Sequence, residues 1–269
     1  MLPFVNVFGR QFGMYAIMVV VGILAAGRWA YKTTKKRGHD ANKMILILIF
    51  GAFGAFLGGY GLHGLLRIRY FLELFGSGSI PGWEDIIMAW QRTFGGMIFF
   101  GGLFGGLLVG FFTASKLKLP LGEFADIATP AIPLFHTFGR IGCFLSGCCF
   151  GIESRLGFTM QNSLVEVANE VRRLPVQLLE GALNFGLFLI LAYLLKKDRF
   201  AGKLLIVYLV LYSLMRFVLE FWRGDAVRGF VFGLSTSQFI SVIILIGIVV
   251  YELIQRLRKR HEREHTKRS

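Results

Sequence analysis

The sequence predicts an all-α, polytopic membrane protein with seven transmembrane helices, its N-terminus outside the cell and its C-terminus in the cytoplasm. Apolar residues make up 55% of the 269 residues, and the mean hydropathy is +0.61. Several apolar runs approach the length of about 20 residues that crosses a bilayer as a helix. No repeat, low-complexity linker or soluble domain interrupts them, so residues 1–269 are predicted to form a single integral membrane domain.

Seven apolar runs are long enough to be spans, covering residues 12–31, 44–66, 94–114, 122–148, 176–195, 203–222 and 231–254. The first run lacks a small-residue cleavage site after its apolar core, which predicts a retained helix instead of a signal peptide. The fourth run contains Pro130 and Pro133. Proline removes a helical hydrogen bond, and a broken helix at membrane depth is tolerated where it lines the protein interior or a wet cavity. The fourth span is therefore predicted to be broken.

The net charge of +14 is distributed by topology. Basic residues gather after the first, third, fifth and seventh spans, at residues 32–43, 116–118, 196–203 and 256–268. These clusters fall on one side of the membrane, which the positive-inside rule makes the cytoplasmic side. Residues 256–269 are predicted to be a basic cytoplasmic tail at anionic lipid headgroups. Because no aromatic residues alternate with the basic ones, no nucleic-acid partner is predicted.

Two segments between spans are predicted to lie on the outer side. Residues 67–92 mix aromatic and apolar side chains with Glu73, Glu84 and Asp85. This composition indicates either an amphipathic arm in the outer interface or an aromatic belt beside the neighbouring spans. Residues 151–173 form an outer polar loop that either contacts a soluble partner or caps the helices.

Charged side chains inside two apolar segments are the most informative feature. Arg140 lies in a glycine-punctuated run, and Arg216, Glu220 and Arg223 have the spacing i, i+4, i+7. On a helix these three share one face. An ionisable group inside a bilayer is costly and faces a protein interior or a wet cavity. Paired guanidinium groups there predict an anionic ligand, above all a phosphate.

The fourth and fifth spans carry further polar groups. His136, Arg140 and Cys143 also have the spacing i, i+4, i+7. His136 is a general base, a residue that orients Arg140, or a residue that bonds a nearby carbonyl group. Arg140 either binds phosphate or forms a structural ion pair, with Glu180 as the candidate partner. The polar seam of the fifth span is formed by residues on one helix face, Gln177, Glu180 and Asn184.

The glycine pairs and the cysteines indicate function less specifically than the buried charges do. Gly101 and Gly102 belong to the glycine-rich opening of the third span, which starts at Gly95. This segment either packs closely on another helix or lets a bulky substrate approach the backbone. Cys143, Cys148 and Cys149 are the only cysteines in the chain. They give no disulfide framework, and their spacing lacks the paired C-x-x-C arrangement of metal sites. They are predicted to be small buried thiols, and neither a metal nor a cofactor is predicted.

Four motifs in order along the chain resemble those of the prolipoprotein diacylglyceryl transferase family. Their residues are Gly-Gly-Met and Gly-Gly-Leu at 95–103, Gly-Arg-Ile-Gly at 139–142 with a closing Gly151, Leu-Pro-Val-Gln-Leu-Leu-Glu at 174–180, and Arg-Phe-Val-Leu-Glu-Phe-Trp-Arg at 216–223. The resemblance covers nearly the whole chain and includes the seven spans and their orientation.

The resemblance implies transfer of a diacylglyceryl group from phosphatidylglycerol to the lipobox cysteine thiol of a preprolipoprotein, with release of glycerol phosphate. The implied setting is the bacterial inner membrane, and the implied partners are phosphatidylglycerol, the preprolipoprotein signal peptide and membrane lipids. The residues implied for catalysis are Arg140, Arg216, Glu220, Arg223 and His136. Those implied for substrate binding are Gly139, Gly142, Ser146, Gln177, Glu180, Gly101 and Gly102.

The chain departs from the family pattern at identifiable positions. Phe100 stands where the family typically has a histidine, and Cys143, Ser146 and Cys148 replace residues that are usually Asn or Glu. A phenylalanine cannot accept a proton, so two alternatives stay open. The first is a related phospholipid-dependent transferase with another acceptor. The second is a non-enzymatic lipid-binding or transport protein, although a transporter is expected to have broken helices in both halves.

Overall fold

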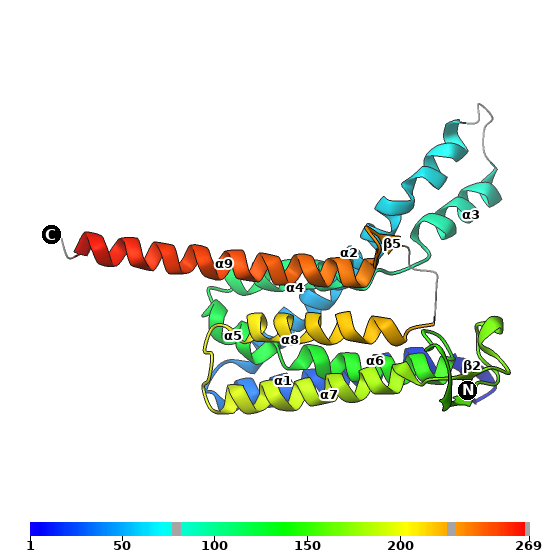
Figure 1. The fold of residues 1–269 in the computed structure, drawn as a ribbon, viewed down its shortest axis with the longest axis horizontal. Helices are drawn as coiled ribbons and strands as arrows, with labels where there is room; N and C mark the ends of the chain where they lie inside the picture. The colour runs from blue at the N-terminus through cyan, green and yellow to red at the C-terminus, as the bar shows by residue number, and fades with distance from the viewer. Residues whose placement is uncertain (77–81, 225–229, 267–269) are drawn as a thin grey trace. The chain divides into compact units, whose positions relative to one another are not determined.

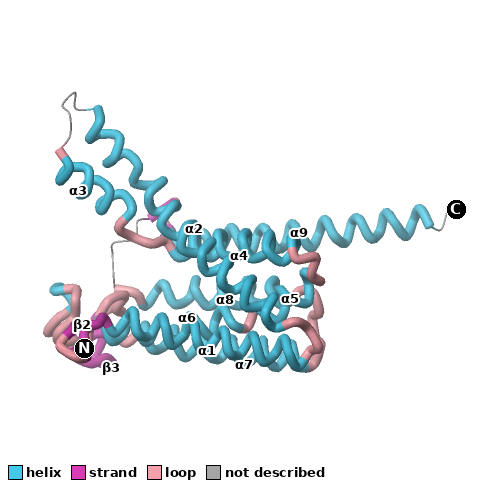
Figure 2. The backbone as a smooth tube through the Cα atoms, turned by 180° about the vertical axis from the view of Figure 1, so that it is seen from behind, coloured by secondary structure: helices cyan, strands magenta, loops and turns pink. Residues whose placement is uncertain are grey.

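The computed structural model describes residues 1–76, 82–224 and 230–266. Helices dominate, as predicted (Figure 1). They are α1 (Met14–Lys36), α2 (Ala41–Gly76), α3 (Trp83–Phe94), α4 (Phe99–Lys116), α5 (Leu121–Ala128), α6 (Ala131–Ser146), α7 (Val176–Lys196), α8 (Leu204–Leu219) and α9 (Thr236–Thr266), with 3₁₀ turns η1 (Glu166–Ala168) and η2 (Glu220–Trp222). The strands form three short antiparallel pairs (Figure 2): β1 (Phe4–Val7) with β2 (Arg10–Gly13), β3 (Glu153–Thr159) with β4 (Arg172–Arg173), and β5 (Phe230–Val231) with β6 (Leu234–Ser235).

Five helical segments of the described chain are long and apolar enough to cross a membrane: Met14–Lys36, Ala41–Leu74, Val176–Lys196, Leu204–Trp222 and Thr236–Arg258. A further apolar helix, Phe100–Lys116, is shorter. The prediction of an all-α membrane protein is therefore confirmed. The predicted fourth span is observed as two helices, because α5 ends at Ala128 and α6 begins at Ala131 after Pro130. The break that the prolines predicted is present.

The chain forms two compact units. One comprises residues 1–29 and 129–269, and the other comprises residues 30–128. We call the first the terminal unit and the second the central unit.

In the central unit, glycines let α2 and α4 pack with their backbones in contact. A Cβ atom added at Gly58 would overlap the carbonyl oxygen of Gly101, and one added at Gly105 would overlap that of Gly54. Small residues at such positions are the usual means of close helix packing in lipid. α3 folds back along the end of α2, where the Nδ1 atom of His63 lies 2.8 Å from the carbonyl oxygen of Thr93 (Figure 1).

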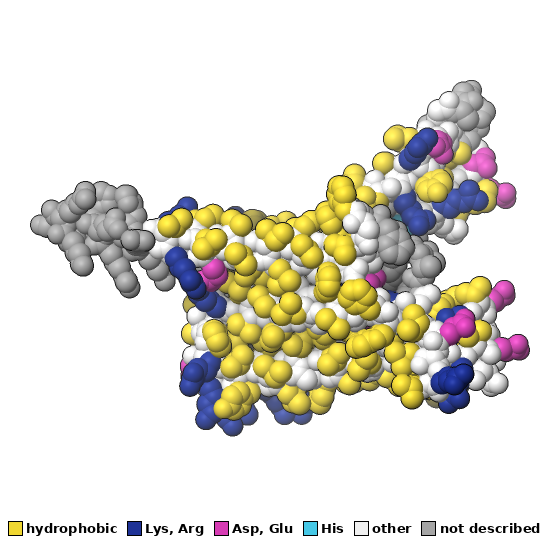
Figure 3. Space-filling view, in the orientation of Figure 1, with side chains coloured by type: hydrophobic (Ala, Val, Ile, Leu, Met, Phe, Trp, Pro, Cys, Tyr) yellow, Lys and Arg dark blue, Asp and Glu magenta, His cyan; other side chains and the backbone are white. Residues whose placement is uncertain are grey.

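In the terminal unit, α6 packs against α7, and α8 packs against both α7 and α9. Hydrophobic side chains are numerous along α7, α8 and the part of α9 that is coloured by side-chain type (Figure 3). The Nζ atom of Lys203, the residue before α8, lies 2.7 Å from Oε1 of Glu252 in the second half of α9. The basic residues after α7 are therefore at the same end of this unit as the basic continuation of α9.

The opposite end of the terminal unit carries a small polar head, which the sequence predicted only as a loop. Strands β3 and β4 enclose a core of Phe150, Met160 and Ala168. The Arg173 guanidinium lies 4.5 Å from the centre of the Phe150 ring. The chain start is joined to this head, because the terminal amine of Met1 donates a hydrogen bond to the carbonyl oxygen of Gln161 at 2.6 Å. The β1–β2 hairpin before α1 was not predicted.

Candidate active site

A fully buried carboxylate, Glu180, is the centre of a charged cluster in the terminal unit. Its Oε1 atom lies 2.8 Å from Nη2 of Arg140. Its Oε2 atom lies 3.5 Å from Nη1 of Arg223 and 3.8 Å from Nη1 of Arg216. The structural ion pair between Arg140 and Glu180, one of the two roles considered for Arg140, is therefore present. One carboxylate brings three predicted arginines together.

A second carboxylate holds Arg216 from the other side. The Nη2 atom of Arg216 lies 2.8 Å from Oε2 of Glu220, and the same nitrogen donates a hydrogen bond to the Ser237 hydroxyl at 3.0 Å. The i, i+4 spacing predicted the contact with Glu220. Ser237 was missed, because it belongs to α9 and nothing in the local sequence marks it as a partner of α8.

Arg223 reaches the cluster by a route other than the predicted helix face. α8 ends at Leu219, η2 occupies the next three residues, and Arg223 has extended backbone angles (φ −83°, ψ 138°). Its backbone forms an antiparallel bridge with Gly151. Glycine is needed there, since a Cβ atom at Gly151 would overlap the carbonyl oxygen of Leu174. The backbone bridge to Gly151, in the segment after α6, therefore holds Arg223 next to Glu180.

Hydrogen-bond donors remain in this cluster. Among the described residues, Nε of Arg140 and Nη1 of Arg216 are buried and have no hydrogen-bond partner. Buried polar groups are nearly always paired in proteins. Planar guanidinium groups bind phosphate in a bidentate manner. The remaining donors are therefore suited to an anionic ligand.

His136 borders the same cluster. Its Nε2 atom lies 3.9 Å from Oε1 of Glu180, and its ring centre is 5.7 Å from that of Tyr212. His136 is one turn before Arg140 on α6, as the i, i+4 spacing predicted. Two of the roles considered for His136, the base and the positioning of Arg140, are compatible with this geometry.

The predicted substrate-binding residues have different surroundings. The Gln177 amide donates a hydrogen bond to the carbonyl oxygen of Cys148 at 2.8 Å, and Ser146 is buried at the end of α6. A Cβ atom at Gly139 would meet open space. Gly142 packs on α1, where an added Cβ would lie 3.1 Å from Cβ of Met18. Gly142 therefore has a packing role in addition to the predicted one.

Gly101 and Gly102 belong to the central unit, whereas the arginine cluster belongs to the terminal unit. A Cβ atom at Gly102 would lie 3.2 Å from the carbonyl oxygen of Ala55 on α2, and Gly101 packs on Gly58. The packing alternative is therefore observed for both glycines. Phe100 is buried in the same helix.

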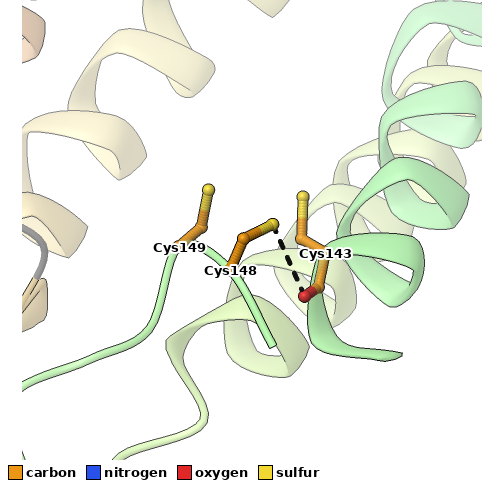
Figure 4. Close-up of side chains that lie close together, drawn as sticks. All are labelled: Cys143, Cys148 and Cys149. Atoms are coloured by element: carbon orange, nitrogen blue, oxygen red, sulfur yellow. Dashed lines mark hydrogen bonds between the residues drawn. The ribbon is translucent and has the colours of Figure 1, made fainter. Parts of the chain in front are cut away.

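The three cysteines lie closer together than their spacing suggests. Their sulfur atoms are all within 4.8 Å of one another (Figure 4). A tight turn at Gly147 brings Cys148 and Cys149 back toward Cys143, which their spacing in the sequence does not reveal.

Comparisons with known proteins agree with the motifs. The family described as prolipoprotein diacylglyceryl transferase matches residues 4–253. The phosphatidylglycerol–prolipoprotein diacylglyceryl transferase of Clostridium tetani is 32% identical over 94% of this chain and 97% of its own length. Its counterpart numbered 2 from Clostridium perfringens is 33% identical over 96% of both chains, and the one from Geobacter sulfurreducens is 31% identical over 91% of this chain and 92% of its own length. The chain belongs to the prolipoprotein diacylglyceryl transferase family.

Proposed function

We propose that this protein transfers a diacylglyceryl group from phosphatidylglycerol to the lipobox cysteine of a preprolipoprotein. The observation that carries the proposal is the cluster of three buried guanidinium groups around Glu180. Buried donors of Arg140 and Arg216 remain without hydrogen-bond partners in the described part of the chain. They supply the positive charge and the forked geometry that a phosphate diester requires.

The charge balance of the reaction explains why such a cluster accelerates it. The acceptor thiolate attacks the glyceryl carbon that carries the phosphate, the carbon–oxygen bond breaks, and its electron pair stays on the phosphate oxygen. A thiolate and a phosphodiester monoanion thereby become a neutral thioether and a glycerol phosphate dianion. Negative charge therefore moves onto the phosphate in the transition state. Fixed positive groups in a dry site stabilise that change more than they stabilise the substrates.

The residues divide into two roles under this proposal. Arg140, Arg216 and Arg223 bind the phosphate, and their three charges exceed those of Glu180 and Glu220 by one. The two carboxylates hold the guanidinium groups in place, as their distances of 2.8 Å to Arg140 and Arg216 support. The residues proposed to contact lipid or peptide in the terminal unit are Gly139, Gly142, Ser146 and Gln177, and His136 orients Arg140 or accepts a proton. Gly101 and Gly102 are proposed as substrate-binding residues of the central unit.

The protein is proposed to lie in the bacterial inner membrane, and the charge distribution supports its orientation there. We infer seven spans, in which α4 and the α5–α6 pair add to the five long apolar helices, with the N-terminus outside and the C-terminus in the cytoplasm. The arginine cluster then lies toward the outer side, because it is at the end of the terminal unit opposite Lys203 and Glu252. The end of α2 with α3 serves as the outer interfacial arm over residues 67–92, a range in which residues 77–81 are outside the part that the structure describes. Residues 151–173 serve as the outer cap, and residues 256–269 as the basic tail, of which 267–269 lie outside the described residues.

The arm has the surface that an interfacial role requires. Trp83 and Trp90 of α3 and Leu72 of α2 are more than half exposed, while Arg69 and Glu73 pair on the surface at 2.9 Å. Exposed aromatic side chains among charges are typical of segments at the headgroup level.

The experiment is transfer to a synthetic lipobox peptide by the purified full-length protein in vesicles that contain phosphatidylglycerol. We expect mass spectrometry to find the diacylglyceryl thioether on the peptide and glycerol phosphate in solution. The matched control is the same peptide with serine at the acceptor position. Glycerol phosphate released without a modified peptide would instead indicate a different acceptor. Restored growth of a strain depleted of its own transferase is the corresponding test in cells, and failure of both tests would contradict the proposal.

A further inference from the structure

The sulfur atoms of Cys143, Cys148 and Cys149 lie close together, and Cys143 is one turn after Arg140 on α6. All lie within 4.8 Å of one another, and the side chains of Cys148 and Cys149 come from the loop after α6 while Cys143 comes from the helix itself (Figure 4). No other cysteine occurs in the chain. Three sulfur atoms this close together indicate a metal site more specifically than the spacing of the cysteines in the sequence does.

The backbone is shaped to bring these sulfur atoms together. Gly147 ends α6 in the left-handed region (φ 76°), and the amide of Cys148 then donates a hydrogen bond back to the carbonyl oxygen of Cys143 at 3.1 Å. Cys149 itself has a positive φ of 59°. A left-handed conformation costs a non-glycine residue on the order of 1–3 kcal/mol, so the surrounding structure must impose it.

Contacts from another helix keep the loop in this shape. The Gln177 amide of α7 holds the carbonyl group of Cys148 at 2.8 Å. Two residues after Cys149, the Gly151 amide donates to the carbonyl oxygen of Leu174 at 3.2 Å. The three thiols are therefore fixed by α6, by α7 and by the segment that precedes α7.

The separation of the sulfur atoms suits a metal ion better than a disulfide. Around a tetrahedral zinc ion with bonds of ~2.3 Å, neighbouring sulfur atoms stand ~3.8 Å apart. A disulfide requires ~2.05 Å, joins only two of the three sulfurs, and between adjacent residues demands a distorted backbone. Zinc favours thiolate ligands, and sites with three protein ligands leave the fourth position open for a reactant.

We propose that Cys143, Cys148 and Cys149 bind a zinc ion, and that the fourth position of this ion takes the acceptor cysteine of the substrate. This inference rests on the proposed transferase function. A thiol that coordinates zinc is deprotonated. The metal would thereby produce the attacking thiolate without a general base.

The cluster is placed for this role. Cys143 lies one turn after Arg140 on α6, and Gly151, two residues after Cys149, pairs with the backbone of Arg223. Zinc with three thiolates carries one net negative charge, which the adjacent guanidinium groups offset. A thiolate bound there would stand beside the phosphate that the arginines hold.

The acceptor thiol gives its proton to water as its sulfur binds zinc. The sulfur then forms a bond to the glyceryl carbon, and the bond from that carbon to the phosphate oxygen breaks with its electron pair on oxygen. The product thioether is neutral and binds zinc weakly, so it leaves and reopens the fourth position.

The first test measures the metal without any assay of activity. We expect the purified full-length protein to hold one zinc ion per chain by elemental analysis. Replacement by cobalt(II) should give the d–d bands of a tetrahedral site and thiolate-to-metal charge-transfer absorption. Cys143→Ser, Cys148→Ser and Cys149→Ser should each lower the metal content and the charge-transfer intensity at least severalfold. The control Thr159→Ala, an exposed position in β3, should change neither.

The second test uses the acceptor itself. A lipobox peptide with cysteine should increase the charge-transfer intensity of the cobalt protein by the contribution of one further thiolate. The same peptide with serine should leave the spectrum unchanged. Transfer activity should fall at least a hundredfold in each cysteine variant that still elutes as folded protein.

The outcomes separate the zinc site from the transferase function. Transfer that continues in metal-free protein, or in variants that lack a cysteine, would overturn the zinc site and leave the function standing. Zinc binding with the expected spectral response but no transfer would support the site and contradict the function. Three free thiols in the untreated protein, binding of copper(I) alone, or a disulfide between two of the cysteines would overturn the inference.

Discussion

Arg140 and Glu180 meet at 2.8 Å between Nη2 and Oε1, in a place where the Glu180 side chain has no exposed surface. The pair joins α6 to α7 and fixes the first of three guanidinium groups around one carboxylate. A single charge therefore determines both the packing of these helices and the geometry of the proposed phosphate site.

Replacing Glu180 by glutamine should destabilise the protein and abolish transfer. The amide keeps the shape of the side chain but leaves three buried guanidinium groups without their shared counter-charge. Breaking a buried ion pair in this way costs about 3–5 kcal/mol. Thermal unfolding in detergent measures the loss, with Glu166→Gln on the exposed turn η1 as the matched control. Equal unfolding temperatures for the two variants would contradict the central role of Glu180.

Arg140→Ala and Arg223→Ala should each abolish phosphatidylglycerol-dependent transfer while the protein still inserts into the membrane. Lysine at either position should restore little activity, because an ammonium group cannot replace the planar fork that binds phosphate. The assay is thioether formation on the lipobox peptide at saturating phosphatidylglycerol. Activity near that of the unchanged protein in Arg140→Ala would remove Arg140 from the phosphate site.

Local spacing was sufficient to predict the contact between Arg216 and Glu220, since residues four apart on a helix are neighbours. It was not sufficient to predict that Arg216, Arg223 and Arg140 share Glu180. That convergence depends on how α6, α7 and α8 pack, and on η2, which takes Arg223 off the helix. Ser237 was missed for the same reason, because its partner lies 21 residues earlier in the chain.

The fold also has parts that local sequence predicted and parts that it did not. Long apolar runs predicted most helices, and Pro130 predicted the break in the fourth span. The strand pair that contains Arg172 and Arg173 and the hairpin before α1 were missed, because two to seven residues of strand give little periodicity. The convergence of the cysteines depends on the left-handed backbone at Gly147 and Cys149, which cysteine spacing alone does not reveal.

Glu220→Gln should reduce transfer severalfold more than Glu166→Gln. Glu220 holds Nη2 of Arg216 at 2.8 Å, so its loss frees that guanidinium to rotate while the Ser237 hydrogen bond remains. We expect a rise in the KM for phosphatidylglycerol together with a fall in kcat. If both glutamine variants kept full activity, Glu220 would have no part in positioning Arg216.

Gly58→Ala should destabilise the central unit, and Gly61→Ala should not. Both glycines lie in α2, but a Cβ atom at Gly58 would overlap the backbone of α4, whereas one at Gly61 would meet open space. Alanine at an unhindered helix position is favoured over glycine by about 1 kcal/mol. The unfolding temperature in detergent should therefore fall for Gly58→Ala and stay equal or rise for Gly61→Ala. Equal unfolding temperatures for Gly58→Ala and Gly61→Ala would contradict the close contact of α2 with α4.

His136→Phe tests whether His136 acts as a base or positions its neighbours. Loss of a general base lowers the rate on the order of 10²–10⁴-fold. The distance of 3.9 Å to Glu180 and the contact with Tyr212 favour positioning, because Glu180 already binds Arg140. We therefore expect His136→Phe to lower kcat less than tenfold. Phe100→His in the same background should then recover none of that loss. A loss of a hundredfold or more in His136→Phe that Phe100→His partly restores would make a histidine base the source of the thiolate.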